Sequence, residues 1–171
     1  KITDDSCIAF VKTLLDKGHE AMIEHYSFSV KFICDRGVSH EIVRHRIAAF
    51  AQESTRYCNY AKAKFDNEIT VIKPFFFDCL HKWDAWKRSC ADAETAYFKL
   101  IDDGASPQEA RSVLPNSLNT EIVMTANLRE WRHFFKLRTA DTAHPQMREI
   151  TRPLLSELKR LIPVIFDDIQ Y

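Results

Sequence analysis

Apolar residues recur with a helical period in several stretches of the chain. Within residues 6–17, Ile8, Val11 and Leu14 fall on one face of a helix, and Gly18 can end that helix. The same spacing predicts further helices, which cover residues 79–103, residues 128–138 and a last segment that begins near residue 146 and is interrupted by Pro153 and Pro163. The chain is therefore expected to be rich in helix.

Two more helices are predicted from their start signals. Residues 106–109, Ser-Pro-Gln-Glu, have the spacing of a capping box with proline at the first helical position, and the helix that they open ends at Pro115. Another helix is predicted to begin at Ser39 and to end before Gln52, with a buried side that carries Ile42, Val43 and Ile47.

Strands are predicted where the apolar period changes to two. Residues 28–34 alternate between apolar and more polar positions, and residues 69–72, just before Pro74, form a short β-branched run. Residues 121–125 fit a strand or a helix equally well. Helices and strands that do not alternate regularly indicate an α+β fold.

Composition narrows the class of protein. A chain of 171 residues with 46% hydrophobic residues fits one folded domain, and its formal net charge of zero argues against a dedicated nucleic-acid-binding protein. The five cysteines contain no Cys-x-x-Cys pair, so we expect neither a disulfide framework nor a zinc ribbon, and a reducing cytoplasm is the natural setting. No apolar run is long enough to predict a membrane span. With only three glycines, the chain can hold no glycine-rich phosphate loop, so side chains would have to bind any nucleotide phosphate.

The run Arg44-His45-Arg46 is the most informative local feature. Arginine offers a forked, permanently charged donor that suits phosphates and anionic rings. Two arginines at i and i+2 cannot share one face of a helix, so the run is expected to form a turn or a helix end that faces an anionic ligand. Ser54 and Arg56 follow closely in a polar segment.

The histidines and cysteines suggest neither a metal site nor a nucleophile. His40-Glu41 with His45 approaches the zinc-protease motif, but the histidines are five residues apart where the motif has four, and the extra residue turns the second ring about 100° further around the helix. We therefore expect no metal. No cysteine is marked by a neighbouring base, and a free cysteine is usually a small buried apolar residue.

A second basic group contains Arg129, Arg132 and Arg138, with Arg111 before it. A single arginine is more often paired with an acid on a solvated surface than bound to a ligand. That interpretation weakens here because amide, hydroxyl and imidazole side chains accompany the arginines, at Gln52, Ser54, Asn127 and His144. Trp131, Phe134 and Phe135 are expected in the core.

Four blocks of the chain, taken in order, resemble flavin-dependent thymidylate synthases. The specific one is VRHRIAAFAQESTRY at residues 43–57. The others are GHEAMIEH at residues 18–25, ARSVLP at residues 110–115, and a C-terminal pattern with Asn127-Leu128-Arg129, His133, Leu137-Arg138 and His144-Pro145-Gln146.

The resemblance implies a fold, a reaction and an assembly. The fold would be α+β, a mixed sheet flanked by long helices as in thymidylate synthase-complementing proteins. Residues 1–171 would form a single domain whose N-terminal strand is absent or shortened in this sequence. The enzyme would methylate dUMP to dTMP, with methylenetetrahydrofolate as the carbon donor and with FAD, reduced by NADPH, as the hydride source. It would be a cytoplasmic homotetramer with active sites between subunits, without nucleic-acid or membrane partners.

The resemblance also assigns residues. The FAD-binding residues would be His19, Glu24, Arg44, His45, Arg46, Ile47, Asn127, Arg129, His133 and His144. The dUMP-binding residues would be Glu41, Gln52, Ser54, Arg56, Arg111 and Arg138, with Arg138 and Ser54 as the catalytic pair. Fixed arginine donors beside the uracil would stabilise negative charge as it develops, and no cysteine nucleophile would be needed.

Two other classes remain open from the sequence. A single-stranded RNA or nucleotide-binding module without catalysis would use basic groups next to aromatic residues. A helical interaction protein would leave the Arg-His-Arg run unexplained. A visible absorption spectrum distinguishes a flavin-dependent enzyme from both, because only a flavoprotein is coloured.

Overall fold

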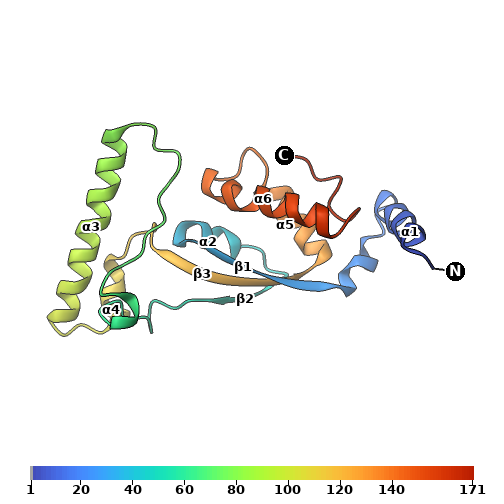
Figure 1. The fold of residues 1–171 in the computed structure, drawn as a ribbon. Coiled ribbons are helices and arrows are strands. Elements are labelled where there is room, and N and C mark those ends of the chain that lie inside the picture. The colour runs from blue at the N-terminus through green and yellow to red at the C-terminus, as the bar shows by residue number, and fades with distance from the viewer. Residues whose placement is uncertain (1) are drawn as a thin grey trace. The chain divides into compact units, whose positions relative to one another are not determined.

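The computed structural model, which describes residues 2–171, contains a three-stranded antiparallel sheet with strand order β1–β3–β2 (Figure 1). The strands are β1 (Ser27–Asp35), β2 (Ala49–Gln52) and β3 (Asn119–Asn127). The α-helices are α1 (Asp4–Asp16), α2 (Arg36–Ile42), α3 (Leu80–Asp102), α4 (Pro107–Ala110), α5 (Leu128–Arg138) and α6 (Pro145–Leu161). The predicted α+β class is confirmed, with an antiparallel sheet where a mixed one was expected.

The chain divides into two units. Unit 1 comprises the described residues up to Val30, together with Val43–Phe50 and Val123–Tyr171, and unit 2 comprises Lys31–Ile42 and Ala51–Ile122. Strands β1 and β3 contribute residues to both units.

The core of unit 1 is built on α5. Trp131, Phe134 and Phe135 are fully buried, as their helical spacing predicts. The ring of Trp131 stacks on Phe28 of β1 with centroids 4.9 Å apart, and Phe135 meets Phe166 edge-on. Helix α5 also packs against α6. Aromatic packing therefore fixes the helix that carries most of the polar residues discussed below.

The core of unit 2 gathers around Tyr97 of the long helix α3. Tyr60, Ile69 and Leu118 pack with it, and the indole Nε1 of Trp86 donates to Ser117 Oγ at 2.9 Å. The capping box predicted at residues 106–109 is present, with Ser106 and Glu109 bonding each other's backbone amides. Among the described residues, no helix is long and apolar enough to cross a membrane.

Three helix and strand predictions need correction. The helix predicted from Ser39 ends at Ile42, and residues 49–52 pair with β3 as strand β2, so Ile47 is 73% exposed instead of buried. The run at residues 69–72 makes only one isolated bridge, between Val71 and Leu118.

Helix α6 continues through Pro153 instead of breaking there. Its buried stripe of Met147, Thr151, Leu155 and Leu158 keeps helical spacing on both sides of the proline. Pro153 itself is exposed, so water can satisfy the carbonyl that loses its amide donor. Residues 121–125, which the sequence left open, belong to β3 and alternate between buried and more exposed positions.

Candidate functional site

The Arg44-His45-Arg46 run forms a loop between α2 and β2, as its charge spacing predicted. His45 is buried, with 4% exposure, whereas Arg44, Arg46 and Ile47 are exposed. Arg44 lies in a turn, and His45 and Arg46 have no regular secondary structure, so the backbone of this run can place the imidazole against α5 and leave both guanidinium groups exposed.

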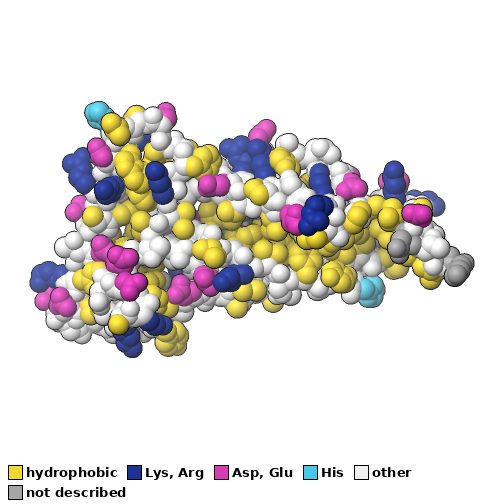
Figure 2. Space-filling model, viewed as in Figure 1, with side chains coloured by type: hydrophobic (Ala, Val, Ile, Leu, Met, Phe, Trp, Pro, Cys, Tyr) yellow, Lys and Arg dark blue, Asp and Glu magenta, His cyan; other side chains and the backbone are white. Residues whose placement is uncertain are grey.

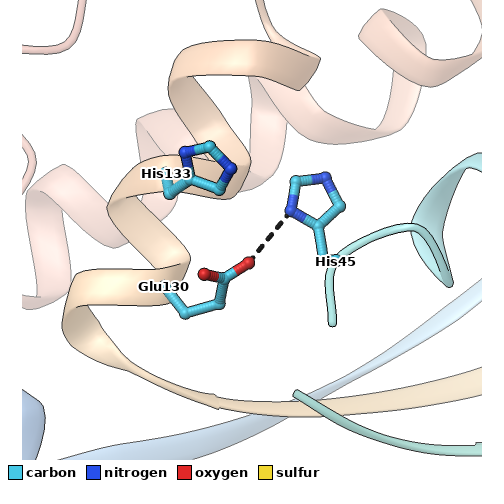
Figure 3. A group of neighbouring side chains, drawn as sticks. All are labelled: His45, Glu130 and His133. Carbon is cyan, nitrogen blue, oxygen red and sulfur yellow. Dashed lines mark hydrogen bonds and ion pairs between the residues drawn. The ribbon is translucent and has the colours of Figure 1, made fainter. Parts of the chain in front are cut away.

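The opposite wall of the site is the first half of α5. Asn127 caps this helix, and its side-chain oxygen accepts the amide N–H of Glu130 at 2.9 Å. Glu130 and His133 lie one turn apart on the helix and both face His45 (Figure 3). The Nδ1 atom of His45 lies 3.1 Å from Oε1 of Glu130.

These two segments and the chain near η1, a 3₁₀ helix at Glu20–His25, enclose a cavity of about 750 Å³ in unit 1. Eight of the residues that were expected to bind FAD line it: Glu24, Arg44, His45, Arg46, Ile47, Asn127, Arg129 and His133. The sequence therefore located a real concave site, of a size typical for ligand pockets.

Two residues of the expected FAD set do not line the cavity. His144 is the N-cap of α6, and its Nδ1 accepts the amide N–H of Gln146 at 3.3 Å. His19 directly precedes η1 and is exposed, and its backbone N–H donates to Leu14. Their roles toward a cofactor stay predictions.

The arginines that line the cavity differ in whether a carboxylate neutralises them. Arg129 forms ion pairs with Glu24 at 2.6 Å and with Glu20 at 3.4 Å. Within the described chain, Arg44 and Arg46 form neither an ion pair nor a hydrogen bond through their side chains. The loop therefore presents two uncompensated guanidinium groups to this cavity, as an anion site requires.

Hydrogen bonds fix the protonation state of His45. Arg138 at the end of α5 donates from Nε to His45 Nε2 at 3.0 Å, and a guanidinium can only donate. The ring proton must therefore reside on Nδ1, from which it is donated to Glu130. Burial, with the positive charges of Arg138 and His133, lowers the pKa of His45 to about 4, and burial raises the pKa of Glu130.

His45, Glu130 and His133 also form a possible metal-ligating group, because their ligand atoms lie within 4.8 Å of one another. A metal on His45 Nδ1 would move the ring proton to Nε2, where it would oppose the N–H of Arg138. The adjacent guanidinium would also repel a cation. The hydrogen-bonded arrangement therefore explains this group better than a metal does.

A second cavity, of about 480 Å³, lies in unit 2. Arg111 lines it, together with Arg36, His40 and Thr55, and its lining contains no carboxylate. Of the residues expected to bind dUMP, Arg111 lines this cavity. Three others of that set, Glu41, Ser54 and Arg56, are adjacent in sequence to the lining residues His40 and Thr55. This cavity is also suited to an anion.

The remaining residues of the expected dUMP set have local contacts. Gln52 donates from Nε2 to Ser39 Oγ at 2.8 Å and to Thr120 Oγ1 at 3.3 Å, and Ser54 Oγ accepts the amide of Arg56 at 3.4 Å. Glu41 lies half-buried in α2, and Arg138 belongs to unit 1. None of these contacts decides a role toward the nucleotide.

Comparison with known proteins decides the family. The sequence model described as "Thymidylate synthase complementing protein" matches residues 1–164. The chain belongs to the thymidylate synthase complementing protein family. Among curated relatives, the flavin-dependent thymidylate synthase of Geobacter sulfurreducens is 34% identical over 170 residues, covering 98% of this chain and 72% of the relative. The enzyme of the same name from Pyrococcus abyssi is 32% identical over 170 residues, covering 96% of this chain and 69% of the relative.

Several residues of this family member line the unit 1 cavity although they were not among those expected to bind FAD, namely Glu20, Glu130, Arg132 and Lys136. A usable signal existed for Glu130 and Lys136, because each stands three residues from His133 and so shares its helical face. The burial of Glu130 and Arg132 depends on partners far along the chain, which spacing does not reveal.

Burial weakens three of the five thiols of this family member as nucleophiles. All five cysteines are free. Burial raises the pKa of Cys34 to about 12, and it also raises the pKa values of Cys58 and Cys90. These three thiols therefore stay protonated at neutral pH and are poor nucleophiles.

The depressed pKa of His45 predicts acid destabilisation. In the unfolded chain, His45 takes up a proton below about pH 6.5, whereas in the folded state it stays neutral until about pH 4. The free energy of unfolding therefore falls as the pH falls through this window. Between pH 7 and pH 5, His45 should contribute a loss of about 2 kcal/mol in the free energy of unfolding. Glu130, whose folded pKa is raised, acts in the opposite direction and reduces the net loss.

Urea unfolding at pH 7 and pH 5 measures this effect. The variant His45→Gln should lose less stability on acidification than the parent, and His81→Gln, at an exposed position on α3, should behave like the parent. Equal acid sensitivity of His45→Gln and the parent would contradict a neutral, buried His45.

Proposed function

We propose that this chain is a flavin-dependent thymidylate synthase, which methylates dUMP to dTMP with methylenetetrahydrofolate as the carbon donor and FAD, reduced by NADPH, as the hydride source. The observation that carries the proposal is the unit 1 cavity, where the family's Arg-His-Arg run meets the Asn127 end of α5. The names of the relatives from Geobacter sulfurreducens and Pyrococcus abyssi support the same activity.

FAD would bind in the unit 1 cavity. Arg44 and Arg46 would pair with its phosphates, since they are exposed and unpaired in a chain too poor in glycine for a backbone phosphate loop. Asn127, Arg129, His133 and Ile47 would provide the further polar and apolar contacts. When bound, the flavin supplies the hydride, and the protein positions the reacting groups.

The dUMP site would use the predicted set of Glu41, Gln52, Ser54, Arg56, Arg111 and Arg138. Arg111 would bind the phosphate, because the unit 2 cavity that it lines contains basic groups and no acid. Arg138 would stabilise the charge that develops on the uracil oxygen as carbon 5 becomes nucleophilic, and Ser54 would contact the same nucleotide. No protein thiol takes part.

A flavin-binding measurement tests the proposal. The purified protein should show the visible absorption of an oxidised flavin, which NADPH should bleach in the presence of dUMP. Replacing Arg46 with alanine should weaken FAD binding about tenfold or more, because loss of one charged donor costs about 1.5–3 kcal/mol.

The matched control for that experiment is Arg88→Ala. Arg88 is exposed on α3 and lines neither cavity, so its loss should leave the FAD affinity unchanged. A parent protein without affinity for FAD would contradict the proposal, and an Arg46→Ala variant with unchanged affinity would contradict the assigned site.

An RNA-binding function has weaker support. The net charge is zero, and basic and acidic side chains are interspersed on the face shown in Figure 2. Sequence-independent binding of single strands requires a basic groove with stacked aromatic platforms, whereas Trp131, Phe134 and Phe135 are fully buried.

A homotetramer in the cytoplasm completes the proposal. Large apolar side chains are exposed on the isolated chain, among them Phe75 at 57% and Leu80 at 75%, and a neighbouring subunit would cover such residues. The five free cysteines agree with a reducing compartment. Light scattering should give four times the chain mass of 19.9 kDa, and a fully active monomer would contradict this assembly.

A further inference from the structure

The carboxylate of Glu130 is buried, and among the described residues it forms no ion pair with a lysine or an arginine. Its side chain is 7% exposed, and that of the neighbouring His45 is 2% exposed. Holding a carboxylate away from water disfavours its charged form, and burial accordingly raises the pKa of Glu130. An apolar side chain of similar size would avoid the cost of burying that group, so the carboxylate needs an explanation.

Helix capping does not supply the explanation. The cap of α5 uses the backbone N–H of Glu130, which donates to Asn127 Oδ1, and any residue at this position offers the same N–H. The side chain points the other way, toward the imidazole (Figure 3).

The hydrogen bonds continue from Glu130 to the end of the helix. The Nδ1–H of His45 donates to Glu130 Oε1 at 3.1 Å, and Nε2 of the same ring accepts from Arg138 Nε at 3.0 Å. The middle ring can serve both neighbours only as the Nδ1–H tautomer. The carboxylate stabilises that tautomer, because it can accept a hydrogen bond but cannot donate one when ionised.

We infer that Glu130 is a positioning residue, which fixes the tautomer of His45 so that the ring holds the guanidinium of Arg138 in the orientation needed for its work on the substrate. The inference rests on the proposed function, in which Arg138 stabilises the charge that develops on dUMP. Without the carboxylate, His45 can adopt the Nε2–H form, which turns a donor toward a donor and removes the hydrogen bond between the ring and Arg138 Nε.

Rate measurements on a pair of variants test the inference. Glu130→Met removes the acceptor and keeps the volume, and it should lower kcat about tenfold, while the urea midpoint and FAD content stay close to the parent's. Glu130→Gln can still present an oxygen to Nδ1–H and should lose less than about threefold. Glu149→Met, at an exposed position on α6, is the matched control and should keep the parent's rate.

A double-mutant cycle separates positioning from a general structural effect. If Glu130 acts through Arg138, then Glu130→Met should change kcat less than about twofold when Arg138 is already alanine. An equal loss of rate with and without Arg138 would overturn the inference.

Nitrogen-15 NMR of histidine-labelled protein reads the tautomer without the reaction. The parent's His45, assigned by its absence in His45→Gln, should show a protonated Nδ1 and an unprotonated Nε2, and Glu130→Met should shift this ring toward Nε2–H. A parent ring protonated on Nε2, or a ring unchanged in Glu130→Met, would overturn the inference. A parent that binds FAD but forms no dTMP would instead overturn the proposed reaction, and the tautomer shift would then stand as the test of the Glu130–His45 link.

Discussion

Replacing Arg138 with alanine is expected to lower the rate of dTMP formation about a hundredfold, which corresponds to about 3 kcal/mol of lost transition-state stabilisation. Arg138 is well placed for this role because its surroundings leave it little freedom. Its Nε is bound to His45, and its backbone carbonyl accepts the hydroxyl of Thr151 in α6 at 2.9 Å. A donor that is already oriented stabilises developing charge without reorganising during the reaction.

Steady-state rates of the purified variant measure the effect of this substitution. FAD content and the urea midpoint should stay near those of the parent, so that the loss appears in kcat. Arg160→Ala is the control, since Arg160 is exposed on α6 and pairs with Glu157, one turn away. Parental turnover in Arg138→Ala would remove Arg138 from the catalytic assignment.

Arg132 should matter for stability instead of catalysis. Its side chain is 5% exposed and bonds Asp168 through two nitrogens at 2.6 and 2.8 Å. It also donates to the carbonyl of Ile165 and to Glu20. The Asp168 side chain is 55% exposed, so water can solvate the carboxylate that Arg132→Ala leaves behind. The substitution still removes a buried guanidinium and its charged hydrogen bonds, and it should lower the free energy of unfolding by about 2–3 kcal/mol.

Chemical denaturation of Arg132→Ala measures this loss. Arg132→Lys provides a graded comparison, because lysine keeps the charge but lacks the planar fork that bonds both oxygens of Asp168, and an intermediate loss is expected. Arg160→Ala again serves as the exposed control, with an effect below about 0.5 kcal/mol. An Arg132→Ala variant as stable as the control would show that these contacts contribute nothing.

Helical period located most of the fold because long amphipathic helices carry their signal in one segment. Helices α3 and α5 and strand β1 agree with their predictions within a few residues. The wrong predictions concern segments whose structure depends on pairing with a distant strand or on exposure of one helix face to solvent. Residues 49–52 form a strand because β3 lies beside them, and Pro153 is tolerated because its side of α6 is exposed. Neither condition can be read from local spacing.

The candidate site shows the same limit at the level of single residues. The charge pattern located Arg44 and Arg46 correctly in a loop. In contrast, Arg129, Arg132 and Arg138 form one basic group in the sequence but have different partners in the structure. Arg129 pairs with the glutamates of η1, Arg132 is a buried ion-pair partner, and Arg138 bonds a histidine. Only the fold brings those partners together.

In the Arg44–Arg46 loop, a buried histidine stands between two exposed arginines. The site should therefore tolerate a changed side chain in this loop better than a changed loop length. A substitution in this loop removes one contact and leaves the direction of the other side chains unchanged. Insertion or deletion of a single residue before His45 would bring a different side chain to the buried position where the imidazole contacts Glu130 and Arg138. Protein engineers who graft new residues into this loop should therefore treat its residue count as fixed and vary only the side chains.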